Sequence, residues 1–162
     1  MEIFPFEKDG CVAVAPHGKN GDLPGFAEMP LPGHSLHLDA PTMLIIEDAP
    51  LIAFDLAETM RELGFDVRAI AANHEEARQA IEESAPQFAI VDLHLGRKQD
   101  NIRPSEELLA QLDAVGCLCL IFSGDEAACR RMGERFPHFA VLTKPAERSK
   151  LASKLEALRN AR

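Results

Sequence analysis

The sequence has too few basic residues for a nucleic-acid surface. It contains 17 Lys and Arg against 26 Asp and Glu, which gives a formal net charge of -9. Binding to phosphate backbones or to anionic membranes depends mainly on Lys and Arg. We therefore expect no nucleic-acid partner and no membrane partner.

Long apolar runs and paired cysteines are also missing. No stretch approaches the roughly 20 apolar residues of a transmembrane helix, and the N-terminus lacks a basic region followed by an apolar one. The cysteines Cys11, Cys117, Cys119 and Cys129 form no CxxC pair and have no His at zinc-finger spacing. We expect buried free thiols in a reducing compartment, and hence a cytoplasmic protein.

The first forty residues differ in composition from the rest. Pro and Gly recur every few positions, as in GKNGDLPGFAEMPLPGHS, and such a stretch does not sustain helices or strand ladders. The apolar segments EIFPF and CVAVA leave two alternatives, a solvated tail or a strap that packs on the domain. We expect an irregular extension over residues 1–40, with or without short strands, and a folded domain over residues 41–162.

Beyond residue 41, apolar runs alternate with segments of helical spacing. The expected strands are MLIIED (43–48), FDVRAIAA (65–72), QFAIVD (87–92), CLCLIFSG (117–124) and HFAVLTKP (138–145). The expected helices cover residues 50–64, 73–85, 104–116, 125–136 and 146–160. Pro50, Asn73, Gly64 and Gly116 mark helix ends, and Gly133 weakens the fourth helix. The buried face of the first helix is expected to carry Ile52, Leu56, Thr59, Met60 and Leu63.

This alternation predicts a doubly wound α/β fold. Continuous apolar runs are typical of parallel strands that helices cover on both faces. Ligands of such sheets bind at the carboxyl ends of the strands. The residues that end each strand are therefore the candidates for function.

Polar residues stand at four of these ends. They are Glu47, Asp48, Asp92, Ser123 and Lys144. Neighbouring carboxylates raise one another's pKa unless cations neutralise them, and Mg²⁺ suits a site with one or two carboxylates and ligand oxygens. We expect Asp92 to be exposed at the sheet edge, with its charge shared by Mg²⁺ and Lys144.

The same residues suit phosphoryl transfer. An ionised Asp92 can attack phosphorus to form an acyl phosphate, while the cation and Lys144 stabilise charge on the transferring oxygens. The hydroxyl of Ser123 and the backbone amide of Gly124 are then positioned to donate to the attached group.

The order of these residues resembles the receiver domain of two-component response regulators. The resemblance covers about residues 42–160 and rests on Glu47-Asp48 after LII, Asp92 in IVDLHLG, Ser123-Gly124 after LIF and Lys144-Pro145 after VLT. It implies a CheY-like (flavodoxin-like) sheet of strand order 2-1-3-4-5. It also implies these roles: Asp92 as phosphoacceptor, Asp48 as direct Mg²⁺ ligand, Glu47 as ligand through water, the His94 backbone carbonyl as the remaining ligand, Ser123 as phosphoryl sensor and Lys144 as its ion-pair partner.

Finer features resemble the alphaproteobacterial subgroup called FAT GUY receivers, notably IEDAPLIAFDLAETMRELGF and the Leu-Gly pair after the aspartate. The chain departs from the pattern at Asp125, where the subgroup has an aromatic residue, and at Val141, where most receivers have Tyr or Phe. These departures put in question the usual coupled rotation of the hydroxyl and the aromatic residue. Phe122 and Phe139 are possible substitutes, although the core is the expected place of both.

Three functions fit the site to different degrees. A receiver would accept phosphate from a sensor histidine kinase or a phosphotransfer protein and act on a downstream protein, or drain phosphate from the kinase. A haloacid dehalogenase type of hydrolase would need a carboxylate where His94 stands, and a pseudo-receiver would not need the intact acidic set. We expect a stand-alone, non-enzymatic receiver, monomeric or homodimeric, in which His94 tunes water access, the fourth helix moves, and the first helix faces the kinase.

Overall fold

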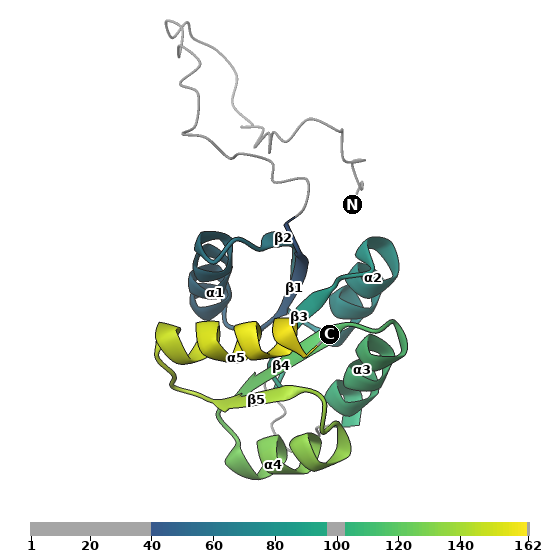
Figure 1. The fold of residues 1–162 in the computed structure, drawn as a ribbon. Coiled ribbons are helices and arrows are strands. Elements are labelled where there is room, and N and C mark those ends of the chain that lie inside the picture. Colours follow the sequence, from purple (N-terminus) through teal and green to yellow (C-terminus); the bar gives the residue numbers. More distant parts are fainter. Residues whose placement is uncertain (1–39, 97–102, 162) are drawn as a thin grey trace, which may run out of the picture. The chain divides into compact units, whose positions relative to one another are not determined.

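The computed structural model describes residues 40–96 and 103–161. Five strands and five helices alternate in these residues (Figure 1). The strands are β1 (Thr42–Ile46), β2 (Asp66–Ala71), β3 (Phe88–Val91), β4 (Leu118–Ser123) and β5 (Ala140–Thr143). The helices are α1 (Pro50–Glu62), α2 (His74–Ser84), α3 (Arg103–Ala114), α4 (Glu126–Arg135) and α5 (Arg148–Asn160). Apart from Ala40, the predicted extension lies outside the described residues, and its boundary stays a prediction.

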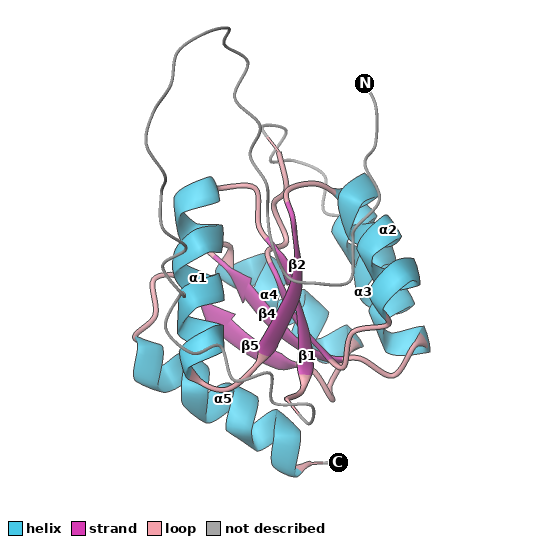
Figure 2. Ribbon diagram, turned by 90° about the horizontal axis from the view of Figure 1, so that it is seen from above, coloured by secondary structure: helices cyan, strands magenta, loops and turns pink. Residues whose placement is uncertain are grey.

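The strands form one parallel sheet in the order β2-β1-β3-β4-β5. This confirms the predicted doubly wound α/β fold and the strand order. Helices α1 and α5 cover one face, and α2, α3 and α4 cover the other (Figures 1 and 2). The order reverses at β1 and β3, so the chain leaves these neighbouring strands toward opposite faces of the sheet. Such a switch point leaves a crevice at the carboxyl ends of the strands.

Both faces of the central strands are buried. Along β3, Ala89 and Val91 pack with α2, α3 and α4, whereas Phe88 and Ile90 pack with α1 and α5. This arrangement explains why the strands have continuous apolar runs instead of alternating ones. The free thiols of Cys117, Cys119 and Cys129 are buried, as predicted, whereas Cys11 lies outside the described residues.

The predicted helix ends are also present. The side chain of Asn73 accepts hydrogen bonds from the backbone amides of Glu75 and Glu76 at 3.1 and 3.0 Å, and so caps α2. Gly64 follows the end of α1 with a φ of +84°, and Gly116 follows α3 with a φ of +72°. These conformations favour glycine, as the helix-end prediction requires.

The predicted face of α1 is wrong at its first turn. Ile52 is 41% exposed, and the buried residues of α1 are Ala53, Leu56, Ala57, Thr59 and Met60. Two of these are alanines, which a search for large apolar residues overlooks. Ile52 lies instead beside the carboxyl ends of the strands, where it lines a cleft. Within residues 40–96 and 103–161, no helix is both long and apolar enough to cross a membrane.

Candidate functional site

A cleft of about 630 Å³ lies at the carboxyl ends of the central strands. Every predicted site residue lines it: Glu47, Asp48, Asp92, His94, Ser123, Gly124 and Lys144. These residues come from the ends of β1, β3, β4 and β5, and the parallel register brings them to the same edge of the sheet. Residues nearly a hundred positions apart in sequence are thus assembled by topology alone.

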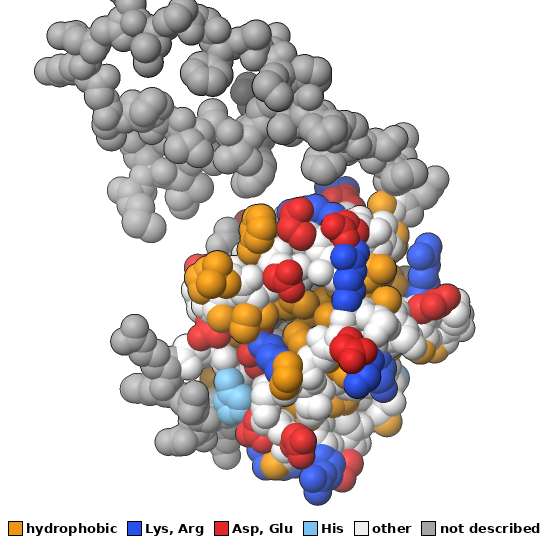
Figure 3. Space-filling view, turned by 90° about the vertical axis from the view of Figure 1, so that its left-hand side faces the viewer, with side chains coloured by type: hydrophobic (Ala, Val, Ile, Leu, Met, Phe, Trp, Pro, Cys, Tyr) orange, Lys and Arg blue, Asp and Glu red, His pale blue; other side chains and the backbone are white. Residues whose placement is uncertain are grey.

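Apolar side chains of α1 are exposed next to this cleft. Ile52 lines the cleft, and the neighbouring Leu51 and Phe54 are 87% and 64% exposed. Figure 3 shows hydrophobic side chains on the surface of this side of the molecule, interrupted by acidic ones. Several exposed apolar side chains on one side of a molecule are a feature of contact surfaces.

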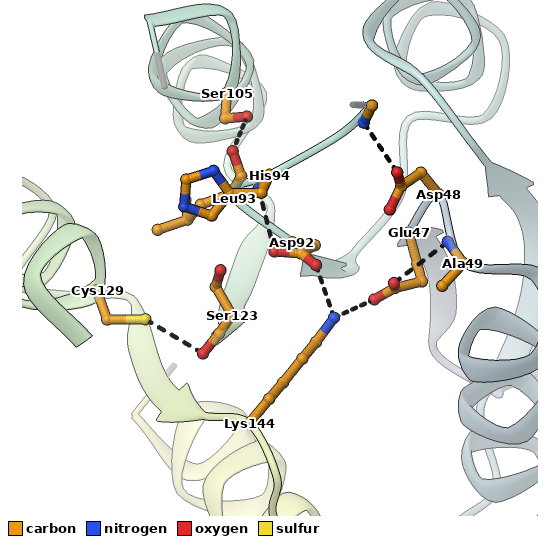
Figure 4. Close-up of polar contacts among 11 residues, drawn as sticks. Glu47, Asp48, Ala49, Asp92, Leu93, His94, Ser105, Ser123, Cys129 and Lys144 are labelled. Carbon is orange, nitrogen blue, oxygen red and sulfur yellow. Dashed lines mark hydrogen bonds and ion pairs between the residues drawn. The ribbon is translucent and has the colours of Figure 1, made fainter. Parts of the chain in front are cut away.

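Lys144 holds the two buried carboxylates of the site. Its Nζ donates to Glu47 Oε2 at 2.5 Å and to Asp92 Oδ2 at 2.7 Å (Figure 4). Burial raises the pKa of Glu47, and the hydrogen bond from Lys144 only partly opposes this effect. Burial alone would lower the pKa of Lys144, but its hydrogen bonds to Asp92 and Glu47 outweigh burial and raise it. Lys144 therefore remains charged in the cleft.

Asp92 is buried, contrary to the expectation that it is exposed at the sheet edge. Only 8% of the residue is exposed, because β3 is the central strand and the loops after the neighbouring strands close around its end. Besides Lys144, the backbone amide of His94 donates to Asp92 Oδ1 at 3.1 Å. Within the described residues, the protein itself therefore supplies one donor for each carboxylate oxygen of Asp92.

The carboxylates of Glu47, Asp48 and Asp92 can offer oxygens that lie within 4.8 Å of one another. Glu47 and Asp92 are buried, and Asp48 is exposed. The backbone amide of Gly96, a residue with a φ of +93°, donates to Asp48 Oδ2 at 2.9 Å and holds this carboxylate at the cleft. A set of hard oxygen donors partly open to water fits Mg²⁺.

Ser123 has a buried hydroxyl without a partner. The residue is 0% exposed, and within the described residues its Oγ makes no hydrogen bond. Its backbone carbonyl, by contrast, accepts from the amide of Lys144 at 2.9 Å. Most buried hydroxyls are hydrogen-bonded, because an unsatisfied one costs free energy. In Figure 4 this hydroxyl lies beside Asp92, where a bound group could accept its hydrogen.

Asp125 is a cleft residue that sequence reasoning did not assign to the site. Its Oδ1 accepts from the amide of Ala128 at 2.8 Å and so caps α4, while Oδ2 lies 3.1 Å from Nε2 of His94. The Ala128 amide, followed by His94, holds the pKa of Asp125 below its ordinary value. The sequence Ser-Gly-Asp directly before a helix predicts that the aspartate caps it. The contact of Asp125 with His94, however, joins residues that only the fold brings together.

The aromatic residues near the site are in the core, as expected. Phe122 and Phe139 are each 6% exposed. Nζ of Lys144 lies 5.3 Å from the centroid of the Phe122 ring, within the range of a cation–π contact. Val141 is half-buried on β5.

Comparisons with known proteins agree with this fold. No protein-family model matches the chain. The transcriptional regulatory protein PdtaR of Mycobacterium tuberculosis is 35% identical over 69 residues, which are 43% of this chain and 33% of PdtaR. The matched segment therefore spans about a third of the length of that relative.

The structural similarity extends further. The receiver domain of the PhyR response regulator from Erythrobacter litoralis has a TM-score of 0.63 at 25% identity, over 76% of this chain and 92% of that domain. The receiver domain of a modulated diguanylate cyclase from Desulfovibrio desulfuricans has a TM-score of 0.63 at 28% identity, over 76% and 96% of the two chains. The described part of this chain therefore has the fold of response regulator receiver domains, with a CheY-like strand order.

Proposed function

We propose that this protein is a cytoplasmic response regulator that accepts a phosphoryl group on Asp92. The donor is a sensor histidine kinase or a histidine phosphotransfer protein, and the output is contact with a downstream protein or removal of phosphate from the kinase. The buried, unpartnered hydroxyl of Ser123 carries the proposal, because it faces an aspartate that Lys144 already binds. A phosphoryl group on Asp92 would give that hydroxyl an acceptor.

The cleft residues divide the chemistry among them. A carboxylate oxygen of Asp92 attacks phosphorus, a P–O bond forms, and the P–N bond to the donor imidazole breaks with its electron pair on nitrogen. Lys144 stabilises the negative oxygens, and Ser123 and the amide of Gly124 donate to them. Glu47, Asp48, Asp92 and the backbone carbonyl of His94 would hold Mg²⁺, which when bound neutralises charge on phosphoryl oxygens.

The exposed apolar side chains of α1 support this helix as a contact surface for the donor protein. Leu51 and Phe54 are exposed on the same helix as Ile52, which lines the cleft. A donor protein must bring its phosphohistidine to Asp92, so its surface has to cover the rim of the cleft. We assign α1 to this contact, and the face of α4, β5 and α5 to the output.

Intact-mass analysis tests the proposal. The full chain is incubated with Mg²⁺ and acetyl phosphate or a phosphorylated histidine kinase, beside Asp92→Asn and the control Asp113→Asn. Asp113 is an exposed carboxylate on α3 that pairs with His138 and lies outside the cleft. We expect one phosphoryl group on the wild type and on Asp113→Asn, and none on Asp92→Asn.

Two results would contradict this expectation. Full labelling of Asp92→Asn would move the acceptor elsewhere. No labelling of the wild type with competent donors would favour a pseudo-receiver, an interaction module that phosphorylation does not regulate.

A further inference from the structure

A buried serine is hydrogen-bonded to the residue that follows the proposed phosphoacceptor. Ser105, the third residue of α3, is 0% exposed, and its Oγ donates to the carbonyl of Leu93 at 2.7 Å (Figure 4). The same Oγ lies 3.0 Å from Nε2 of His74, the first residue of α2. One hydroxyl therefore joins the starts of two helices to the loop that follows β3.

The direction of these hydrogen bonds follows from counting hydrogens. A serine hydroxyl has one hydrogen, and that of Ser105 is used on Leu93. The hydrogen between Ser105 and His74 must then come from Nε2 of the imidazole. This second bond fixes the rotation of the hydroxyl and keeps its hydrogen directed at Leu93.

The carbonyl that Ser105 holds belongs to a peptide unit with a second role. The N–H of this unit is that of His94, which donates to Asp92 Oδ1 at 3.1 Å. A peptide unit is planar, so fixing its C=O also fixes the direction of its N–H. The amide of Asp92 is itself bonded to the carbonyl of Ile46 at 2.9 Å, and the Leu93 side chain is buried in the core. The peptide between Leu93 and His94 thus links Ser105 to the orientation of the Asp92 carboxylate.

We propose that Ser105, held in turn by His74, is a positioning residue for phosphoryl acceptance on Asp92. It contacts neither Asp92 nor the residues of the acidic cluster. It sets the plane of the Leu93–His94 peptide, whose amide keeps one oxygen of Asp92 engaged while Lys144 binds the other. This inference rests on the proposed function and adds α2 and α3 to the elements that determine its rate.

A matched control separates positioning from stability. Ser84 makes the same kind of bond near the end of α2, from its Oγ to the carbonyl of Ala80 at 2.6 Å. Ser84→Ala and Ser105→Ala each remove one serine-to-carbonyl hydrogen bond, but only the second touches the peptide beside Asp92. A second pair, His74→Gln and His74→Leu, keeps or removes the donor to Ser105 without deleting the buried hydroxyl.

The experiment compares these four variants with wild type in the full chain. Two quantities are measured: the rate constant of phosphorylation by acetyl phosphate at saturating Mg²⁺, and the ¹H–¹⁵N shifts of the His94 and Gly96 amides before donor is added. We expect Ser105→Ala to slow phosphorylation roughly ten- to a hundredfold, the size of effect that a small misplacement of a reacting group produces. The ¹H–¹⁵N signal of the His94 amide in this variant should move in the direction that a weaker hydrogen bond produces. We expect His74→Leu to show a smaller loss of the same kind, and His74→Gln and Ser84→Ala to match wild type.

Each outcome decides the proposal. A wild-type rate and an unshifted His94 amide in Ser105→Ala would overturn it, as would an equal loss in Ser84→Ala. If Ser105→Ala does not fold, the difference between His74→Leu and His74→Gln decides instead. If wild type accepts no phosphoryl group, the proposed function fails, and the His94 shift alone decides whether Ser105 orients this peptide.

Discussion

Two buried serines of this domain have opposite hydrogen-bond states. Ser105 has both a donor and an acceptor partner, whereas within the described residues the Oγ of Ser123 has none. The difference follows from position, because Ser105 lies between α2, α3 and the loop after β3, and Ser123 ends β4 at the cleft. Burial alone therefore does not tell which serine is available to a bound group.

We predict opposite effects on stability for alanine at these two positions. Ser105→Ala leaves the carbonyl of Leu93 unsatisfied, so the free energy of unfolding should fall by about 1–3 kcal/mol. Ser123→Ala removes an unsatisfied hydroxyl, so the free energy of unfolding should stay equal or rise slightly. Urea denaturation followed by circular dichroism measures both, because the chain has no Trp or Tyr for fluorescence. A clear destabilisation by Ser123→Ala would mean that its hydroxyl has a partner before phosphorylation.

His74 predicts a pH dependence of stability. Burial, followed by the charge of Arg78, holds its pKa below the ordinary 6.5, and Glu107 opposes the shift only in part. The unfolded chain then binds a proton at a pH where the folded chain does not. The free energy of unfolding should therefore fall as the pH falls through 6.5 toward the lower folded-state pKa.

The comparison with His74→Gln isolates this contribution. Glutamine keeps a donor for Ser105 and does not titrate. Urea denaturation at about pH 7.5 and about pH 5.5 should show a larger loss for wild type than for the variant, because the window begins near the unfolded-state pKa. Equal losses would mean that the imidazole of His74 accepts its proton as readily in the folded state.

At the scale of the elements, α4 lies close to β5 because Gly133 has no side chain. A Cβ at position 133 would meet Cγ2 of Val141 at 3.1 Å. Glycine inside a helix lowers stability by about 1 kcal/mol relative to alanine. Gly133 therefore weakens α4 but allows it to pack close to β5. Gly133 belongs to the helix that we expect to move. Val141 occupies the strand position where most receivers have an aromatic residue.

We predict that the effect of Gly133→Ala depends on Val141. In the wild-type background, the new methyl group would press against Val141. This contact should offset much or all of the stability of about 1 kcal/mol gained from helix propensity. In the Val141→Ala background the contact is gone, so Gly133→Ala should stabilise by the full amount. A double-mutant cycle by urea denaturation measures the coupling. The same effect in both backgrounds would show that space against β5 does not limit α4.

Much of this element structure is predictable from sequence because it rests on local signals. The apolar runs, Pro50, Asn73 and the helix-ending glycines are read directly from neighbouring residues. They predict the strands, the helices and the polar residues at the strand ends. The burial of Asp92 and the exposure of Ile52 were not predictable in this way. Both depend on which loops close over the ends of the strands. The links of Asp125 to His94 and of Ser105 to Leu93 also join residues that only the fold brings together.

The whole domain assembles its acidic cluster at the switch point of the sheet. Glu47 and Asp48 follow β1, and Asp92 follows β3, the strand beside it. The neighbouring carboxylates repel one another, and Lys144 neutralises only part of their charge. The folded chain therefore keeps excess negative charge at this edge, which the unfolded chain does not concentrate.

This difference predicts that Mg²⁺ stabilises the folded domain. A ligand that binds only the native state raises the free energy of unfolding by about 2.7 kcal/mol at a concentration of about 100 times its Kd. We expect the Tm, followed by circular dichroism, to rise with the logarithm of the Mg²⁺ concentration. Asp48→Ala should abolish the rise, because it removes the exposed carboxylate of the cluster. Asp55→Ala removes the same charge from the exposed surface of α1, outside the cluster, and should leave the rise intact. A rise that both variants share would assign the effect to general screening of the net charge of -9, and the acidic cluster would then not be a metal site.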